Sequence, residues 1–352
     1  MQNAECRSRV NQGGGRRAEG GGQPGAENGG QRPENGAADF RPPGCGLRPP
    51  AWAHLADELA DRLSRESVIR RNEPLAKHTT LRVGGPAEVY VEPAGEGDLA
   101  LVLRFCRQHE LPLLVIGRGS NLLVKDGGFP GVVICLAQPQ FTRIEIAGQR
   151  LHCGAGARLK QVAVEARRHG LAGLEFLEGI PGSVGGALRM NAGAMGGATF
   201  DVVESVRLMD YSGAVRECKV GELAVEYRSC PMLKTHIALS AVWVGWADLP
   251  EGIGQRMNQF SRKRWNSQPA APSAGCIFKN PLSIPAGRLI DELGLKGTRV
   301  GGAMVSAEHG NFIVTDPAAS ARDVLGLIDL VRGRVRAERG IELETEVEIV
   351  GQ

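Results

Sequence analysis

Apolar residues recur along this chain with two different spacings, which separate the expected helices from the expected strands. Leu55, Leu59 and Leu63 repeat at intervals of four, as on one face of a helix, and Val68 continues that side. We therefore expect a helix over residues 51–69. The same spacing predicts helices over residues 97–110, from Gly156 to about 168, over 255–265, over 286–294 and over 320–339. Ser320 with Asp323 is expected to cap the start of the last helix, and Gly340 to end it.

Strands are expected where apolar residues run together or alternate with polar ones. Apolar runs predict strands over residues 113–116, 122–124, 132–136, 202–210, 215–219, within 231–244 and on both sides of SAEHGN within 300–315. Residues 142–153 read as a hairpin that turns at Ala147-Gly148. The last segment alternates with period two, with Glu342, Glu344, Glu346 and Glu348 on one face. This mixture of helices and strands predicts an α+β fold.

Composition divides the chain into three parts. Residues 1–50 are rich in Gly and Pro and nearly lack aliphatic side chains, which predicts a disordered tail. A basic interaction arm is the alternative for this segment. A length of 352 residues favours two domains over one. We expect a first domain over residues 51–247, with its core over about 80–247, and a smaller second domain over 248–352.

Charge and cysteine usage exclude several classes of protein. A net charge of +3 gives no electrostatic case for binding nucleic acid. The eight cysteines show no CxxC or His-paired spacing, so no metal site is expected, and their scatter fits a reducing compartment. No apolar run approaches the roughly 18 residues of a membrane span, and the N-terminus lacks the apolar region of a secretory signal. We expect a cytoplasmic protein without a membrane partner.

The segment LEFLEGIPGSVGGALRMNAGAMGG, residues 174–197, is the most informative stretch of the chain. Its glycines let backbone N–H groups approach a ligand, and successive N–H groups form a concave nest that suits a pyrophosphate. Ser183 and Asn191 could add side-chain hydrogen bonds. A flexible linker is the alternative, but Ile180, Val184, Leu188 and Met190 have the character of packing anchors. We favour a cofactor loop.

Another glycine loop, Gly117–Asn121, comes first along the chain and follows the expected strand 113–116. The carboxyl end of a buried strand is where α/β sheets usually bind ligands. Because apolar residues 122–124 continue as a strand, GRGSN does not open a helix as a dinucleotide fingerprint would. GRGSN alone is weak evidence for a cofactor site, and it gains support because the chain also contains the other glycine segment.

Four polar positions in apolar surroundings are candidates for chemistry. Cys276 is a packing residue or a proton donor, since an unperturbed thiol is still protonated near neutral pH. Arg228 forms a surface salt bridge or binds a carboxylate through its planar guanidinium. Nothing in the periodicity singles out Glu346 among the four glutamates of the last segment. His309, with Asn311, marks either a turn or a ligand contact.

Eight motifs, in this order, resemble the UDP-N-acetylenolpyruvoylglucosamine reductases, flavoenzymes of peptidoglycan precursor synthesis. The resemblance covers about residues 70–351. The motifs are KHTTLRVGGPAE, VIGRGSNLLV, IPGSVGGALRMNAG, EYRSC, SAGCIFKNP, AGRLIDELGLKG, GGAMVSAEHGNFIV and LETEVEIVG. Each motif alone is weak, but eight in sequence are highly specific.

The resemblance implies a two-part FAD-binding domain of the vanillyl-alcohol and p-cresol oxidase type, followed by a smaller α+β substrate-binding domain. FAD would bind through its pyrophosphate on the two glycine segments, with the flavin ring near residues 191–193. The residues implied to bind FAD are Gly117, Arg118, Gly119, Ser120, Asn121, Leu122, Ile180, Pro181, Gly182, Ser183, Gly185, Gly186, Asn191, Ala192 and Gly193.

The implied reaction is hydride transfer from NADPH to FAD and then to the enolpyruvyl double bond of a UDP-N-acetylglucosamine derivative. Arg228 would stabilise the substrate carboxylate with Glu346 beside it, and position 276 would protonate the second carbon. Tyr227, Arg264, Asn280 and His309 are implied as substrate contacts. The product would be UDP-N-acetylmuramate, and the nucleotide sugar is the expected partner. We expect a monomer.

Two features distinguish this chain within the resemblance. Many family members have serine as the proton donor, whereas this chain has Cys276. The segment from Arg228 to Cys276 is too short for the substrate-capping insertion of some members, which indicates the subtype without that loop. Two other classes stay open from the sequence: a related flavin oxidase acting on a sugar or hydroxy acid, and a flavin-free protein that binds nucleotide sugars.

Overall fold

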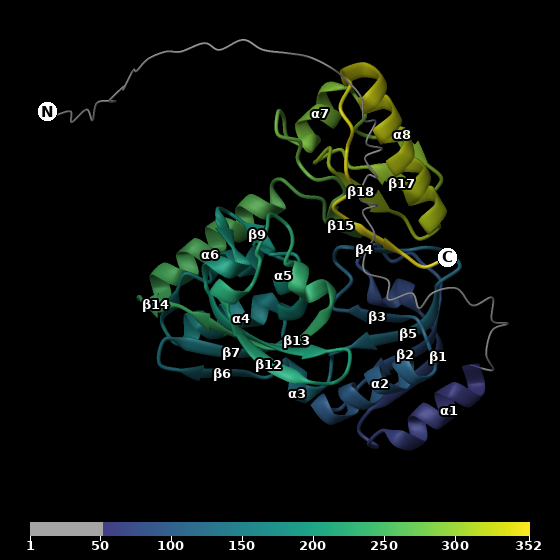
Figure 1. Cartoon of the computed structure of the whole chain (residues 1–352). Coiled ribbons are helices and arrows are strands. Elements are labelled where there is room, and N and C mark those ends of the chain that lie inside the picture. Colours follow the sequence, from purple (N-terminus) through teal and green to yellow (C-terminus); the bar gives the residue numbers. More distant parts are fainter. Residues whose placement is uncertain (1–51) are drawn as a thin grey trace, which may run out of the picture. The chain divides into compact units, whose positions relative to one another are not determined.

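The computed structural model describes residues 52–352 (Figure 1). The tail expected over residues 1–50 lies outside this range. The described residues form three main sheets, with helices packed against them, and the strands come from segments far apart in the sequence.

The first sheet mixes parallel and antiparallel strands in the order β1-β2-β5-β3. The strands are β1 (Val68–Pro74), β2 (Pro86–Glu92), β3 (Leu113–Ile116) and β5 (Phe129–Cys135). β5 pairs in parallel with β2 and with β3, while β1 and β2 are antiparallel. Helices α1 (Trp52–Arg62) and α2 (Glu96–Gln108) lie beside this sheet (Figure 1). A short 3-10 helix, η1 (Leu75–His78), follows β1.

The helix expected over residues 51–69 is too long. The chain leaves the helix at Arg62 and turns, with Ser67 N donating to Ser64 O at 3.1 Å. Both serine hydroxyls donate to the Asp98 carboxylate of α2, which fixes the turn. Val68 therefore begins β1. This strand was not predicted because Arg70, Arg71 and their polar neighbours break the alternation of apolar residues.

The second sheet is antiparallel, in the order β12-β11-β13-β7-β6. Its strands are β6 (Ile144–Ala147), β7 (Arg150–Gly154), β11 (Val203–Asp210), β12 (Val215–Lys219) and β13 (His236–Val244). The expected hairpin is confirmed, but its turn lies one residue later than expected, at residues 148–149, because Ala147 pairs with Arg150.

Helices and short paired segments surround this second sheet. They are α3 (Pro139–Thr142), α4 (Leu159–Arg168), α5 (Val184–Arg189), α6 (Pro250–Trp265), β8 (Leu171–Ala172), β9 (Gly193–Ala194), β10 (Gly197–Ala198), β14 (Trp246–Ala247), η2 (Glu175–Gly179), η3 (Thr199–Asp201), η4 (Val220–Glu222) and η5 (Pro231–Lys234). Helix α6 begins five residues before the expected position, at Pro250 as its first residue, where a missing N–H costs nothing.

The third sheet has the order β15-β18-β17-β16 and comes entirely from the C-terminal part of the chain. Its strands are β15 (Ser273–Cys276), β16 (Arg299–Val300), β17 (Ala303–Val305) and β18 (Phe312–Thr315), with helices α7 (Ala286–Glu292) and α8 (Ala321–Arg339). The expected cap of α8 is confirmed: Asp323 N donates to Ser320 Oγ at 3.1 Å, and Ser320 N donates to Asp323 Oδ2 at 2.9 Å.

The last segment returns from the third sheet to the region of the first glycine loop. β19 (Glu348–Val350) pairs in parallel with β4 (Leu122–Val124). Only these three residues of the expected strand 341–350 are a paired strand. The segment before them crosses the third sheet, where Thr345 makes a single bridge with Phe278. Glu346 lies between these two attachments.

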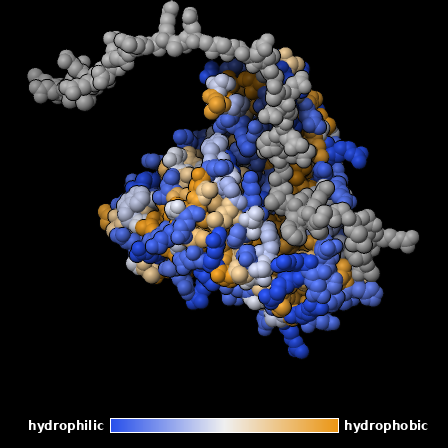
Figure 2. Space-filling view, in the orientation of Figure 1, coloured by the Kyte–Doolittle hydropathy of each residue, from blue (hydrophilic) through white to orange (hydrophobic). Residues whose placement is uncertain are grey.

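Buried side chains form two large groups and a smaller third one. One group extends from Ala56 to Met257 and includes residues of the first sheet, its helices α1 and α2, and the second sheet. The other joins Leu81, Val83 and Leu123 to apolar residues between 274 and 347. The face drawn in Figure 2 is mostly hydrophilic, with apolar side chains scattered over it. The expected division at residue 247 stays a prediction. No helix within residues 52–352 is long and apolar enough to cross a membrane.

Candidate active site

The two glycine segments face each other. A Cβ on Gly117 would lie 2.5 Å from Ser183 Oγ, and a Cβ on Gly182 would lie 3.6 Å from Ser120 Oγ. Gly119 has a φ of +59°, and a Cβ there would lie 2.2 Å from the carbonyl oxygen of His78. A side chain at position 117 would enter the space between the two segments, and one at position 119 would clash with the backbone of His78, which explains the glycines at these two positions.

The first glycine loop presents unpaired backbone donors. Within residues 52–352, the N–H groups of residues 118–121 donate to no backbone carbonyl. The loop is held instead by its acceptors, because the N–H and hydroxyl of Thr80 both donate to Gly119 O, at 3.1 and 3.3 Å. Free N–H groups around a residue of positive φ form an anion-binding nest. The geometry therefore suits a pyrophosphate.

Two guanidinium groups add positive charge at the same place. Burial lowers the pKa of Arg118, and the nearby guanidinium of Arg158 lowers it further. Arg158 is bridged to Ser183 of the other glycine segment. An anion between the segments would relieve the repulsion between these two cations. Arg158 was not predicted from the sequence, where its only signal is its position after the glycines of GAGAR.

The second glycine segment is not a continuous loop, because residues 184–189 form a short helix, α5. Val184 and Leu188 are fully buried on one face of it, which confirms them as packing anchors, whereas Ile180 and Met190 are only half-buried. The loop reading is confirmed only for the residues on either side. Asn191, with a φ of +38°, lies after the helix and donates through Nδ2 to Glu226 O at 3.2 Å.

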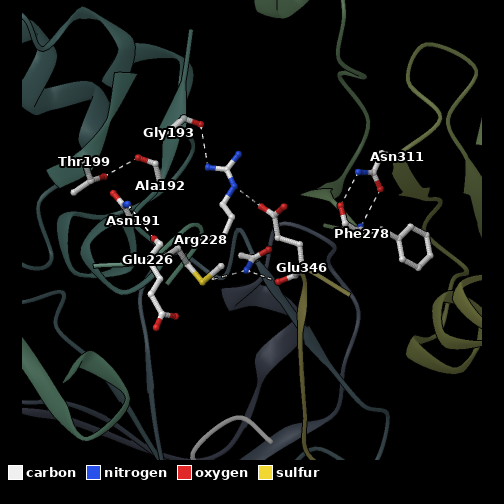
Figure 3. A network of polar contacts seen from close by, with 11 residues as sticks. Asn191, Ala192, Gly193, Thr199, Glu226, Arg228, Phe278, Asn311 and Glu346 are labelled. Carbon is white, nitrogen blue, oxygen red and sulfur yellow. Dashed lines mark hydrogen bonds and ion pairs between the residues drawn. The ribbon is translucent and has the colours of Figure 1, made fainter. Parts of the chain in front are cut away.

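Arg228 lies between the glycine segment and the C-terminal segment (Figure 3). Its Nη1 donates to Gly193 O at 3.3 Å, and its Nε lies 3.2 Å from Glu346 Oε1. The Nε–H is not aligned for a hydrogen bond with that carboxylate, so the contact is an ion pair. Arg228 itself has a φ of +57°, in a tight turn closed by hydrogen bonds between Glu226 and Ser229.

Glu346 is the least exposed of the four glutamates in the acidic segment. Its side chain is 15% exposed, whereas those of Glu342 and Glu344 are about 60% exposed. Burial raises the pKa of the Glu346 carboxyl, and Arg228 and Lys279 lower it. Its ion pair with Arg228 distinguishes Glu346 from Glu348, which is 28% exposed and pairs with Arg189 instead.

Cys276 shares this charged site. Burial raises the pKa of its thiol to about 11, and the Glu346 carboxylate also raises it, while Arg228 and a hydrogen bond with Asn311 lower it. The thiol is therefore protonated at neutral pH. Three residues from distant parts of the sequence, Arg228, Cys276 and Glu346, influence one another directly, as a shared site requires.

Asn311 holds the strand end that carries Cys276. Its side chain is 2% exposed and bonds both backbone groups of Phe278: Phe278 N donates to Asn311 Oδ1 at 2.9 Å, and Asn311 Nδ2 donates to Phe278 O at 2.8 Å (Figure 3). The sequence left Asn311 open between a turn residue and a ligand contact. The structure gives its amide group a positioning contact with the backbone.

The four residues implied as substrate contacts lie in different surroundings. Tyr227 is 64% exposed, with the Arg228 guanidinium over its ring. Asn280 accepts a hydrogen bond from Ala286 N at the start of α7. His309 is half-buried, and burial lowers its pKa. Arg264 lies near Glu178, beside the second glycine segment rather than near Cys276. Their contact with substrate stays a prediction.

Models of two protein families match different parts of this chain. A model of an FAD-binding domain matches residues 87–219, and a model of the C-terminal domain of UDP-N-acetylenolpyruvoylglucosamine reductase matches residues 268–350. A crystal structure of UDP-N-acetylenolpyruvylglucosamine reductase from Thermus caldophilus is 41% identical, with a TM-score of 0.70, over 81% of this chain and 99% of that chain.

Curated relatives match along nearly their whole length. UDP-N-acetylenolpyruvoylglucosamine reductases of Geobacter sulfurreducens and Heliobacterium modesticaldum are each 44% identical, covering 84% and 80% of this chain and 99% and 90% of the relatives. Fold and site define an oxidoreductase with an α+β fold and an FAD-binding domain. The chain belongs to the UDP-N-acetylenolpyruvoylglucosamine reductase family.

Proposed function

We propose that this protein reduces the enolpyruvyl group of UDP-N-acetylglucosamine enolpyruvate to give UDP-N-acetylmuramate, a precursor of peptidoglycan. When bound, FAD would supply the hydride transfer, with NADPH as the reductant. The observation that carries this proposal is the grouping of Arg228, Cys276 and Glu346 beside the glycine segments. NADPH and the nucleotide sugar are cytoplasmic molecules, so we place the protein there.

The residues around the glycine segments fit the cofactor. The free N–H groups of residues 118–121 and the paired cations Arg118 and Arg158 would hold the pyrophosphate. Gly193 O is already bound by Arg228, so a ring near residues 191–193 would lie next to the charged site. FAD bound in this way would bring the reducing group and the proton-donating group into one site.

Arg228 suits the substrate carboxylate. A hydride that adds to the terminal carbon of the enolpyruvyl group leaves an electron pair on the carbon attached to the carboxylate. A fixed cation at that point stabilises the charge as it develops. The ion pair with Glu346 and the hydrogen bond to Gly193 O hold the guanidinium before substrate arrives.

Cys276 suits the proton transfer that completes the reduction. Because burial raises the pKa of its thiol to about 11, the group carries its proton at neutral pH and can donate it to the charged carbon. One hydride and one proton then saturate the double bond, and the thiolate regains a proton from solvent. Glu346, whose pKa is raised by burial, adds a second titratable group beside this reaction.

Purified protein tests the proposal in two steps. The absorbance spectrum should show bound flavin, and anaerobic addition of NADPH should bleach it. Adding UDP-N-acetylglucosamine enolpyruvate without oxygen should then restore the oxidised spectrum. Restoration by oxygen but not by the enolpyruvyl compound would indicate a flavin oxidase. A colourless protein that does not take up added FAD would indicate a flavin-free nucleotide-sugar binder.

A further inference from the structure

Arg189 makes contacts that the reaction above does not use. It is the last residue of α5, inside the second glycine segment, and its side chain is 32% exposed. Its Nη2 lies 2.5 Å from Glu348 Oε1, and its Nη1 donates to Leu233 O at 2.9 Å. The guanidinium is therefore fixed by two different segments of the chain.

The backbone of Arg189 holds a third segment. Its carbonyl accepts a hydrogen bond from Cys230 N at 3.0 Å. Cys230 lies two residues after Arg228, and Glu348 lies two residues after Glu346. Arg189 thus contacts both segments that supply the ion pair of the active site. In each segment the contacted residue lies two positions after the charged one.

Neighbours of Arg189 complete the connection. Asn191 Nδ2 donates to Glu226 O at 3.2 Å. The tight turn around Arg228 is therefore held on one side by Asn191, which follows α5, and on the other by the carbonyl of Arg189 at the end of α5. On the other side, Asn121 Nδ2 donates to Glu346 O at 3.0 Å, and Glu348 N donates to Asn121 O at 3.0 Å. Glu346 is accordingly fixed relative to the first glycine loop.

We propose that Arg189 is a positioning residue that sets the separation of Arg228 and Glu346 and so prepares Arg228 to bind the substrate carboxylate. This inference rests on the proposed function for the identity of that substrate. A cation held in place before binding loses less freedom when the carboxylate arrives. Displacing Arg228 should therefore weaken binding of the carboxylate more than binding of the rest of the nucleotide sugar.

The test compares two ligands on the oxidised flavoprotein, with dissociation constants measured from the change in flavin absorbance. The ligands are UDP-N-acetylglucosamine enolpyruvate and UDP-N-acetylglucosamine, which lacks the carboxylate. The variants are Arg189→Met, Arg189→Lys and Glu348→Gln. Arg207→Met is the matched control, because Arg207 pairs with Glu96 at 2.6 Å in a similarly exposed ion pair away from the site.

Wild-type protein should bind the enolpyruvyl compound more tightly than UDP-N-acetylglucosamine. Arg189→Met should weaken enolpyruvyl binding by roughly tenfold and leave UDP-N-acetylglucosamine binding unchanged. Arg189→Lys should recover part of the loss, because it keeps a cation near Glu348, and Arg207→Met should change neither constant. If Arg189→Met does not fold, Glu348→Gln decides by the same two constants, with a smaller expected loss.

A second measurement follows the pH dependence of kcat. The groups that face the Glu346 carboxyl are Arg228, Lys279 and Cys276. If Arg228 moves away, a lowering influence on the Glu346 pKa is lost, so the limb of the pH profile that reports Glu346 should move to higher pH in Arg189→Met.

Two results would overturn the inference about Arg189, and a third would instead contradict the proposed function. Equal weakening of both ligands would show a merely structural role, and unchanged binding with an unchanged pH profile would show no role. Wild-type protein that does not distinguish the two ligands would instead contradict the proposed function, and with it the carboxylate that Arg189 is inferred to serve.

Discussion

The two halves of the site are built in different ways. The cofactor side consists of backbone, in two glycine segments that face each other, and the N–H groups of residues 118–121 around Gly119, which has a positive φ, form a nest. The acid–base side consists of side chains, Arg228, Cys276 and Glu346, brought together from three segments. A backbone site depends on local conformation, whereas a side-chain site depends on tertiary contacts. The two halves should therefore respond differently to substitution.

The largest effect is expected on the cofactor side, where the addition of a single methyl group should lower stability and prevent flavin binding. In Gly119→Ala, the new Cβ would meet His78 O at 2.2 Å in a residue with a φ of +59°. Because the obstacle is backbone, we expect a loss of about 2–4 kcal/mol in the free energy of unfolding and loss of bound flavin. Flavin absorbance per protein and chemical unfolding measure the two effects.

Gly148→Ala is the control for this substitution. Gly148 has a φ of +60°, but nothing lies within 4 Å of a Cβ there. It should lose only about 1–2 kcal/mol and keep its flavin. Equal flavin loss in both variants would show that the backbone angle alone, and not the close approach of His78 O, explains the glycine at position 119.

The acid–base side should lose rate without losing the cofactor. Cys276→Ala removes the proton donor, so we expect kcat to fall by about 10²–10⁴-fold with flavin retained. Cys276→Ser should keep substantial activity, since a hydroxyl also carries a transferable proton. Stopped-flow reoxidation of the reduced flavin by the enolpyruvyl compound isolates this step from reduction by NADPH.

The pH dependence sharpens the same comparison. Because burial raises the pKa of the Cys276 thiol to about 11, the donor stays protonated until the pH rises toward that value. Wild-type activity that depends on the thiol should therefore decline only at strongly alkaline pH. If the alanine variant reacts at the wild-type rate, Cys276 has no part in the proton transfer.

The two halves also differed in how far the sequence could predict them. The glycine segments, β4 and the caps of α8 follow from local residue types, and the structure confirms that the two segments face each other. Residue types alone could not select Glu346, because burial distinguishes it from Glu344 only after the segment turns back toward β4. The resemblance to a family supplied that choice before the structure gave its physical reason.

Two other features could not be predicted because they depend on interactions of polar residues. β1 was missed since its pairing with β2 rests on backbone hydrogen bonds in a stretch of charged side chains. Arg158 was missed because its role depends on Arg118, a neighbour in space and not in sequence. Local periodicity reports which residues are buried, and it carries no information about which polar groups meet.

Asn311 should show an intermediate effect, mainly on stability. In Asn311→Ala, the N–H and carbonyl of Phe278 lose their partners in a buried place, which should cost about 2–4 kcal/mol. The released strand end should also misplace Cys276 and lower kcat. Asn258→Ala, at an exposed position of α6, is the control and should change stability by less than about 0.5 kcal/mol. Similar losses in both variants would contradict a positioning role.

The smallest effect should be a gain in stability from Glu346→Gln. Since burial raises the folded-state pKa of Glu346 above its unfolded value, the ionised carboxylate disfavours folding at any pH above both values. Glutamine resembles the protonated form, so the variant should melt roughly 1–3 °C higher than wild type at pH 7. The difference should shrink as the pH falls toward 4, where wild-type Glu346 is protonated in both states. Thermal unfolding at the two pH values measures it, with Glu344→Gln as the exposed control. A lower melting temperature at pH 7 would mean that the ion pair with Arg228 outweighs the burial of the carboxylate, and the acid–base side would then be a stabilising feature of the fold and not a strained one.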